Sequence, residues 1–136
     1  MPTYRTRILG VQLYRYNIEG FLHWGFNFYN NQFSYDHVDP FSCSDGECFA
    51  PSGDTYLVYP GDKEEAWESI RLNAIREAMD DIRALQLCES ILGREKTEAL
   101  IAEGLDAPLT FFAYPHDSEY LPDLRERIAR AIEAAL

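Results

Sequence analysis

The chain has 136 residues, of which 46% are hydrophobic, and a formal net charge of -11. This length and composition indicate one globular domain over residues 1–136 that buries a core, and they exclude a disordered chain. The negative charge disfavours nucleic acid and anionic membranes as partners. Because the sequence shows neither a signal peptide nor a membrane span, the expected location is the cytoplasm.

Two elements are predicted at the start of the chain. Over residues 3–16 the apolar side chains fall mostly on one helical face, which indicates a helix. Over residues 20–30 aromatic side chains alternate with His23, Gly25 and Asn27, which is typical of a strand with one bulky apolar face. We expect this strand to be central and buried, in an α/β architecture whose functional edge is the C-terminal end of the strand.

A long loop and a second strand follow. Residues 31–52 are rich in Asn, Ser, Asp and Pro and show no helical or strand periodicity. A loop of this length is usually functional. Residues 53–61 form an apolar run between turn residues, which predicts a short extended strand.

The remainder of the chain is predicted to be helical. Asp62 followed by Glu65 matches the capping pattern in which each residue satisfies a backbone N–H of the first turn. Apolar residues then recur every three or four positions as far as Gly93, a natural stop. Shorter helices are predicted over residues 95–103 and 118–135.

The loop carries potential metal ligands without a complete site. Cys43 and Cys48 are accompanied by a single nearby histidine, His37, which does not supply a four-ligand signature. The odd total of three cysteines indicates reduced thiols in a reducing compartment. We therefore favour a polar, solvent-facing loop over a zinc site, and we predict neither a metal nor a cofactor. His23 could act as a base or ligand, but a lone histidine on a strand is more often a hydrogen-bonded core residue.

Two adjacent carboxylates on the long predicted helix are interpreted as structural. Neighbouring helix positions point about 100° apart, so Asp80 and Asp81 cannot act on one substrate bond as the carboxylates of glycosidases do. Arg71, Arg76 and Asp81 are better explained as anchors between the helix and a loop or strand.

Polar and aromatic side chains gather at the C-terminal end of the predicted first strand, where parallel sheets place their ligands. Trp24 can stack on the apolar face of a sugar ring. Asn27, Tyr29 and Asn30 can exchange hydrogen bonds with hydroxyl or amide groups. For Trp24 and Asn27, core packing is the open alternative.

Three ordered motifs carry a resemblance to a known family. They are Gly20-Phe-Leu-His-Trp-Gly-Phe-Asn-Phe-Tyr29, Gly53-Asp-Thr-Tyr-Leu-Val-Tyr-Pro-Gly61 and Ser69-Ile-Arg-Leu-Asn-Ala-Ile-Arg-Glu-Ala-Met-Asp-Asp81. In this order the chain resembles the bacterial domain-of-unknown-function family 4091. That family looks like the closing part of a (β/α)8 barrel related to glycoside hydrolases, among them β-N-acetylgalactosaminidases.

The resemblance implies a fold that this chain fills only in part. A (β/α)8 barrel normally needs about 250 residues. Residues 1–93 would be a barrel-closing segment with the long helix, and residues 94–136 would be a helical C-terminal tail. The expected fold class is α/β, the terminal segment of a (β/α)8-type barrel, helix-rich with one central strand and a short second strand.

The same resemblance implies that catalysis needs groups from elsewhere. In the related hydrolases an adjacent Asp-Glu pair polarises the acetamido group of the substrate and protonates the leaving oxygen. No Asp-Glu dipeptide occurs in this sequence. We therefore expect a C-terminal segment of a glycoside-hydrolase-like protein that contributes part of a sugar-binding wall and has no catalytic residue of its own. The expected wall residues are Trp24, Asn27, Tyr29, Asp54 and Tyr59.

The expected partners follow from this hypothesis. In the intact parent the ligand would be an N-acetylhexosaminide-type carbohydrate, and the segment would pair with an upstream barrel part or form a homo-oligomer. The alternative is a non-catalytic, self-associating structural or interaction module, because an isolated barrel segment exposes strand edges and apolar helix faces.

Overall fold

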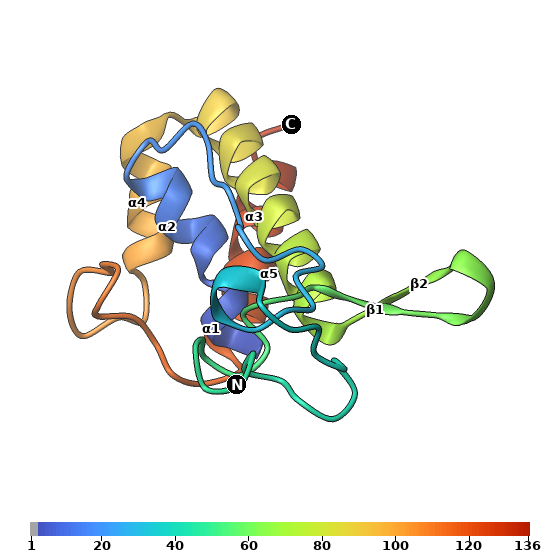
Figure 1. Cartoon of the computed structure of the whole chain (residues 1–136). Helices are drawn as coiled ribbons and strands as arrows, with labels where there is room; N and C mark the ends of the chain where they lie inside the picture. The colour runs from blue at the N-terminus through green and yellow to red at the C-terminus, as the bar shows by residue number, and fades with distance from the viewer. Residues whose placement is uncertain (1–2) are drawn as a thin grey trace. The chain divides into compact units, whose positions relative to one another are not determined.

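A computed structural model describes residues 3–136, and they divide into two compact units. The first unit consists of residues 21–73, and the second combines residues 3–20 with residues 74–136. Figure 1 traces the chain through both units.

Most of the regular structure is helical, and one short sheet accompanies it. The elements, in chain order, are α1 (Thr3–Arg7), α2 (Leu9–Arg15), a 3-10 turn (Gln32–Ser34), β1 (Val58–Pro60), a 3-10 turn (Asp62–Glu64), β2 (Ala66–Glu68), α3 (Ile70–Leu92), α4 (Arg94–Ala102) and α5 (Tyr120–Glu133).

The second unit is a bundle in which α2, α3, α4 and α5 lie alongside one another (Figure 1). Apolar residues recur on the facing sides of these helices, and they bury one another in a single core. Each helix therefore owes its stability mainly to this packing, because short helices are marginal alone. The core residues are Ile8, Val11, Tyr14, Leu85, Cys88, Ile101, Leu109, Tyr120, Leu121, Leu124 and Ile128.

A glycine lets α2 approach α3 closely. A Cβ atom built on Gly10 would lie 2.2 Å from the backbone oxygen of Ala78 and 2.8 Å from its carbonyl carbon. Ala78 is itself fully buried. The two helix backbones therefore meet here with no space for a side chain at position 10.

An ion cluster around the buried Asp81 carboxylate joins α1, α3 and α5. The Arg7 guanidinium donates two hydrogen bonds to the Asp81 carboxylate, at 2.7 and 3.0 Å, and Arg125 Nε donates a third at 2.9 Å. Asp81 is only 5% exposed. The hydrogen bond to Asp81 raises the pKa of Arg7. The structural role predicted for Asp81 is confirmed, but its partners lie on two helices and not on a loop or strand.

Arg94, the first residue of α4, closes the C-terminal end of α2. Its Nη2 atom donates to the backbone oxygens of Tyr14 and Arg15 at 3.2 and 2.8 Å, and its guanidinium carbon lies 4.2 Å from the centre of the Tyr14 ring. It also pairs with Glu89 and Glu98. A guanidinium suits this position because the last carbonyls of a helix lack partners and carry partial negative charge.

Tyr120 links α5 to α4 by a hydrogen bond, and its ionisation lowers the stability of the fold at alkaline pH. Its hydroxyl donates to the Ile101 oxygen at 2.8 Å, and burial raises the pKa of Tyr120 to about 12. An unfolded tyrosine titrates near pH 10. Between about pH 10 and pH 12 the folded state therefore holds more protons than the unfolded state, and the stability present below pH 10 is lost as the pH rises.

We expect Tyr120→Phe to lower the free energy of unfolding by about 0.5–1.5 kcal/mol at neutral pH, because one hydrogen bond is lost. The variant should also lose less stability than the wild type between pH 9 and pH 11, approximate limits that bracket the start of tyrosine titration. Urea unfolding at both pH values measures this. Tyr16→Phe, at an exposed position, is the control and should follow the wild type. Equal pH slopes for all three proteins would contradict the assignment.

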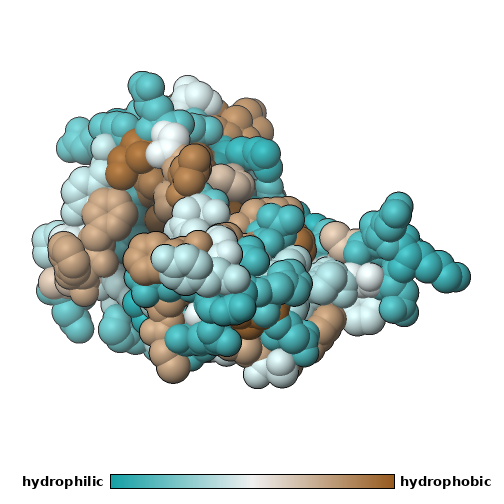
Figure 2. Space-filling model, viewed as in Figure 1, coloured by the Kyte–Doolittle hydropathy of each residue, from teal (hydrophilic) through white to brown (hydrophobic). Residues whose placement is uncertain are grey.

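The regular sheet of the first unit is an antiparallel hairpin of β1 and β2. Tyr59 on β1 lies opposite Trp67 on β2. The connecting turn is closed by a hydrogen bond from Gly61 N to Glu65 O at 2.8 Å. The charged tip of this hairpin is the hydrophilic projection at the right of Figure 2.

The hairpin corrects the predicted start of the long helix. The prediction that this helix begins at Asp62 with Glu65 as its capping partner is wrong, because both residues belong to the hairpin turn. Helix α3 begins at Ile70 instead. Ser69 Oγ accepts the N–H of Leu72 at 3.3 Å, which is the contact of an N-terminal cap.

The prediction of a central, buried strand over residues 20–30 is also wrong. This segment makes only isolated bridges, at Asn27 and at Asn30, and no regular strand. Leu22 and Phe26 are exposed. The chain bends at Trp24 and at Phe26, which interrupts the extended backbone that the aromatic alternation predicts. From Phe26 onward the segment does pair, with Thr55 and Leu57 on one side and with Val38 on the other.

Other sequence predictions agree with the structure. The helix over residues 3–16 is present as α1 and α2, separated at Ile8, and the two C-terminal helices are present as α4 and α5. The strand expected over residues 53–61 is reduced to the three residues of β1. The described part of the chain is helix-rich with a two-stranded antiparallel sheet. None of its helices has both the length and the apolar composition to cross a membrane.

Candidate functional site

All five residues expected in a sugar-binding wall lie in the first unit. The closest pair is Trp24 and Asp54, whose indole Nε1 and carboxylate Oδ2 lie 3.3 Å apart. The Trp24 ring packs edge-on against Phe28 and Phe49, with centroids 5.5 and 5.7 Å away. Trp24 is nevertheless 48% exposed. The indole is therefore held in place while much of it remains accessible.

Close backbone contact brings these segments together. A Cβ atom on Gly25 would lie 2.4 Å from the backbone oxygen of Asp54, so a side chain at position 25 would force the segments apart. Asn27 then forms an antiparallel bridge with Tyr56. Glycine at position 25 thus explains how residues about 30 positions apart share one surface.

A second group of rings surrounds Tyr56. Its ring centroid lies 5.7 Å from that of Tyr29 and 5.1 Å from that of Tyr59. The Tyr29 hydroxyl donates to the Val58 oxygen at 2.8 Å, and burial raises the pKa of Tyr29. The Tyr29 hydroxyl is therefore occupied within the protein, which leaves its ring as the group available to a ligand.

Arg71, in the first turn of α3, sets the electrostatics of this group. Its guanidinium carbon lies 5.1 Å from the Tyr56 ring centre and 5.8 Å from that of Tyr59, and its Nη2 donates to the Tyr56 oxygen at 3.0 Å. Arg71 lowers the pKa of Tyr59, whereas burial raises that of Tyr56 to about 12. The predicted anchoring role of Arg71 is confirmed by its bonds to Tyr56.

A cavity of about 480 Å³ opens beside Tyr59. Phe41 and Trp67 supply two of its aromatic walls, with the Phe41 centroid 5.2 Å from that of Tyr59 and 6.2 Å from that of Trp67. A Cβ on Gly61 would lie 2.6 Å from the Trp67 ring, so this glycine makes room for the indole. The lining residues are Pro40, Phe41, Ser42, Cys43, Ser44, Tyr56, Tyr59, Trp67 and Glu68.

Sequence reasoning missed Trp67 as a lining residue. A long helix that starts at Asp62, as the sequence predicts, would include Trp67, whereas Trp67 is the cross-strand partner of Tyr59 in the hairpin. The signal that could have found it is the Gly61 turn between two short runs with aromatic residues, which is typical of a hairpin.

The structure brings the five expected wall residues into two groups. Trp24 and Asp54 are in direct contact, and Tyr29 and Tyr59 are linked through Tyr56. Asn27 connects the groups through its bridge to Tyr56. Of the five, only Tyr59 lines the 480 Å³ cavity.

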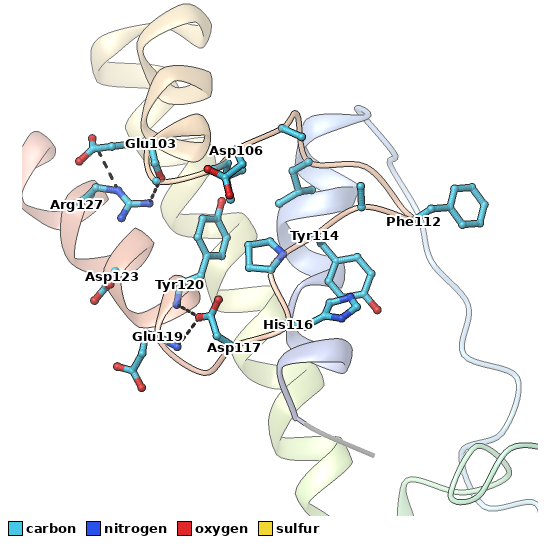
Figure 3. A pocket seen from close by; sticks show the side chains of 16 residues that line it. Glu103, Asp106, Phe112, Tyr114, His116, Asp117, Glu119, Tyr120, Asp123 and Arg127 are labelled. Atoms are coloured by element: carbon cyan, nitrogen blue, oxygen red, sulfur yellow. Dashed lines mark hydrogen bonds and ion pairs between the residues drawn. The ribbon is translucent and has the colours of Figure 1, made fainter.

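A larger cavity, of about 680 Å³, lies in the second unit and contains none of the expected wall residues. Figure 3 shows carboxylates and aromatic rings from the loop before α5 and from α5 itself. Several of these groups have structural partners. Asp117 Oδ1 accepts the N–H groups of Glu119 and Tyr120, both at 2.9 Å, and Arg127 donates to the Glu103 oxygen at 3.2 Å.

The carboxylates that could suggest acid–base chemistry are engaged elsewhere. Asp81 belongs to the ion cluster with Arg7 and Arg125, and Asp80 pairs with Arg83 at 2.7 Å on the surface.

His23 Nδ1 is buried and has no hydrogen-bond partner among residues 3–136. Within the same residues, no group of three or more His, Cys, Asp or Glu side chains is arranged to hold a metal ion.

Comparison with known protein families identifies a match. The family model of the glycoside hydrolase 123 catalytic domain matches residues 1–88, nearly two-thirds of the 136 residues. The matched region contains all five expected wall residues and ends before the 680 Å³ cavity. No curated protein matches the chain.

Proposed function

The chain belongs to the glycoside hydrolase 123 catalytic-domain family, and from this we propose that it contributes part of the sugar-binding wall of a glycoside hydrolase. The observation that carries the proposal is the Trp24–Asp54 pair. It presents an accessible indole and a carboxylate side by side, on a rigid backbone contact at Gly25. Such a surface offers a stacking face and a hydrogen-bond acceptor to one ligand.

The chemistry of the wall suits a sugar. The apolar C–H face of a pyranose packs against an aromatic ring, and its hydroxyl groups need donors and acceptors nearby. Asp54 supplies an acceptor, and Tyr59 supplies a donor whose acidity Arg71 increases. Asn27 adds an amide that can donate and accept. The net charge of -11 favours a neutral ligand over an anionic one.

The finer part of the proposal concerns the reaction. The substrate would be an N-acetylhexosaminide, and the chain would close a (β/α)8 barrel whose catalytic Asp-Glu pair comes from other residues. The 136 residues contain no such dipeptide. The chain would therefore bind the sugar without hydrolysing it, and its partner would be an upstream barrel part or another copy of the chain.

We expect Trp24→Ala to weaken binding of N-acetylgalactosamine by at least about tenfold, equivalent to about 1.4 kcal/mol, because the stacking face is removed. Nuclear magnetic resonance titration detects binding even at millimolar dissociation constants. Tyr35→Ala is the matched control, since Tyr35 is an exposed aromatic residue of the same unit whose ring pairs with that of Phe33.

Two outcomes would contradict this proposal. Equal affinity of the Trp24→Ala variant and the wild type would remove Trp24 from the wall. Turnover of an aryl N-acetylgalactosaminide by the 136-residue chain alone would show that it holds its own catalytic groups.

A second candidate function is a self-associating interaction module. It is favoured by the exposed apolar side chains of one irregular segment, Phe21, Leu22, Trp24 and Phe26. Exposed apolar side chains that lie close together invite association with another chain. Sedimentation that depends on protein concentration, together with no sugar binding, would favour this candidate over the first.

A further inference from the structure

Two cysteines of the first unit lie in one tight loop around Asp45. Cys43 Sγ donates to Asp45 Oδ1 at 3.4 Å. Hydrogen bonds from the backbone of Cys48 and from the Cys43 thiol lower the pKa of Asp45. The Cys43 thiol therefore lies against the Asp45 carboxylate.

The backbone of the loop reinforces this arrangement. Gly46, Glu47 and Cys48 all have positive φ angles, of 60°, 64° and 71°, so the chain reverses direction between the two cysteines. The N–H of Glu47 then donates to Cys43 Sγ at 3.3 Å. The residue immediately before Cys48 is thus in contact with the sulfur of Cys43.

The two thiols differ in accessibility. Cys48 is exposed and Cys43 is half-buried, while the third cysteine, Cys88, is fully buried in the second unit. An exposed thiol is the one that a reagent in solution reaches first, and a neighbouring half-buried thiol is suited to react with it afterwards.

We propose that Cys43 and Cys48 form a thiol-oxidation site that closes to an intramolecular disulfide by exchange with a small disulfide such as oxidised glutathione. The Cys48 thiol loses its proton to solvent and attacks one glutathione sulfur, which breaks that disulfide and releases one glutathione thiol. Cys43 then attacks Cys48 Sγ and releases the second. Two protein thiols are oxidised, and one small-molecule disulfide is reduced to two thiols.

The position of the loop gives the bond a structural consequence. Cys43 lines the cavity beside Tyr59. Phe49, directly after Cys48, packs against Trp24 with a centroid distance of 5.7 Å. Closing the disulfide therefore restrains both the cavity beside Tyr59 and the ring contact of Phe49 with Trp24. Any effect of the bond on sugar affinity rests on the proposed function.

The experiment is mass spectrometry of the intact protein after incubation with oxidised glutathione under native conditions. The wild type should lose the mass of two hydrogen atoms, carry no glutathione, and keep one thiol that reacts only after denaturation. Cys43→Ser should hold one stable glutathione adduct, because the resolving thiol is missing. Cys48→Ser should form neither the internal bond nor more than a trace of adduct.

Other outcomes would overturn the inference. They are a wild type that accumulates two glutathione adducts, one that forms disulfide-linked dimers, and one that keeps all three thiols. None of these results depends on sugar binding, so the failure of the oxidation site and the failure of the proposed function are distinguishable.

Discussion

Replacing Asp81 with alanine is expected to lower the free energy of unfolding by about 1.5–3 kcal/mol, because it removes charge-assisted hydrogen bonds from two arginines to a buried carboxylate. Arg7 and Arg125 both bond to this carboxylate, and Asp81 is 5% exposed. The three residues come from α1, α3 and α5, so the loss should loosen the bundle as a whole. Urea unfolding followed by circular dichroism measures it.

The neighbouring carboxylate provides the control. Asp80 pairs with Arg83 on the same helix at the surface, where an ion pair contributes about 0–1 kcal/mol. Asp80→Ala should therefore unfold at nearly the wild-type urea concentration. If the two alanine variants were equally stable, the ion cluster would not have the structural weight assigned to it.

Gly10→Ala should destabilise the second unit, toward the upper end of the range of about 1–3 kcal/mol that overpacking typically costs. The added Cβ would lie 2.2 Å from the Ala78 oxygen, and the obstacle is helix backbone that no side-chain rotation can move. Helices α2 and α3 must separate to admit it. Thermal unfolding of the purified variant measures the effect.

Gly20→Ala is the control for Gly10→Ala. It tests whether the destabilisation comes from the contact between α2 and α3 or from replacing any glycine by alanine. A Cβ at position 20 would meet no atom within 4 Å. We expect a change within about 0.5 kcal/mol for such a surface position. A Gly10→Ala protein as stable as Gly20→Ala would show that α2 and α3 are farther apart than described.

The helices were predictable from the sequence because their pattern is local. Apolar spacing and the stop at Gly93 gave α4, α5 and most of α3. The start of α3 was not predictable in the same way. Asp62 and Glu65 have the composition of a helix cap but serve a hairpin turn, since pairing of β1 with β2 outweighs a local preference.

The candidate site was predictable only in part, because its geometry depends on contacts far apart in sequence. Composition and the family resemblance suggested Trp24 and Asp54, but their contact depends on the close backbone approach at Gly25. The expected burial of residues 20–30 required strand neighbours that no local pattern reveals. Trp67 was not predicted as a cavity-lining residue because its position beside Tyr59 follows from the hairpin register.

The pairing register of β1 and β2 also limits how the length of the hairpin turn can vary. Side chains alternate between the two faces of a strand. Inserting or deleting one residue in the turn before β2 would therefore shift β2 by one position. The indole of Trp67 would then lie on the other face of the hairpin, away from the Tyr59 ring. Among related sequences, the number of residues between these two rings should therefore be held more strictly than the identities of the charged residues at the tip.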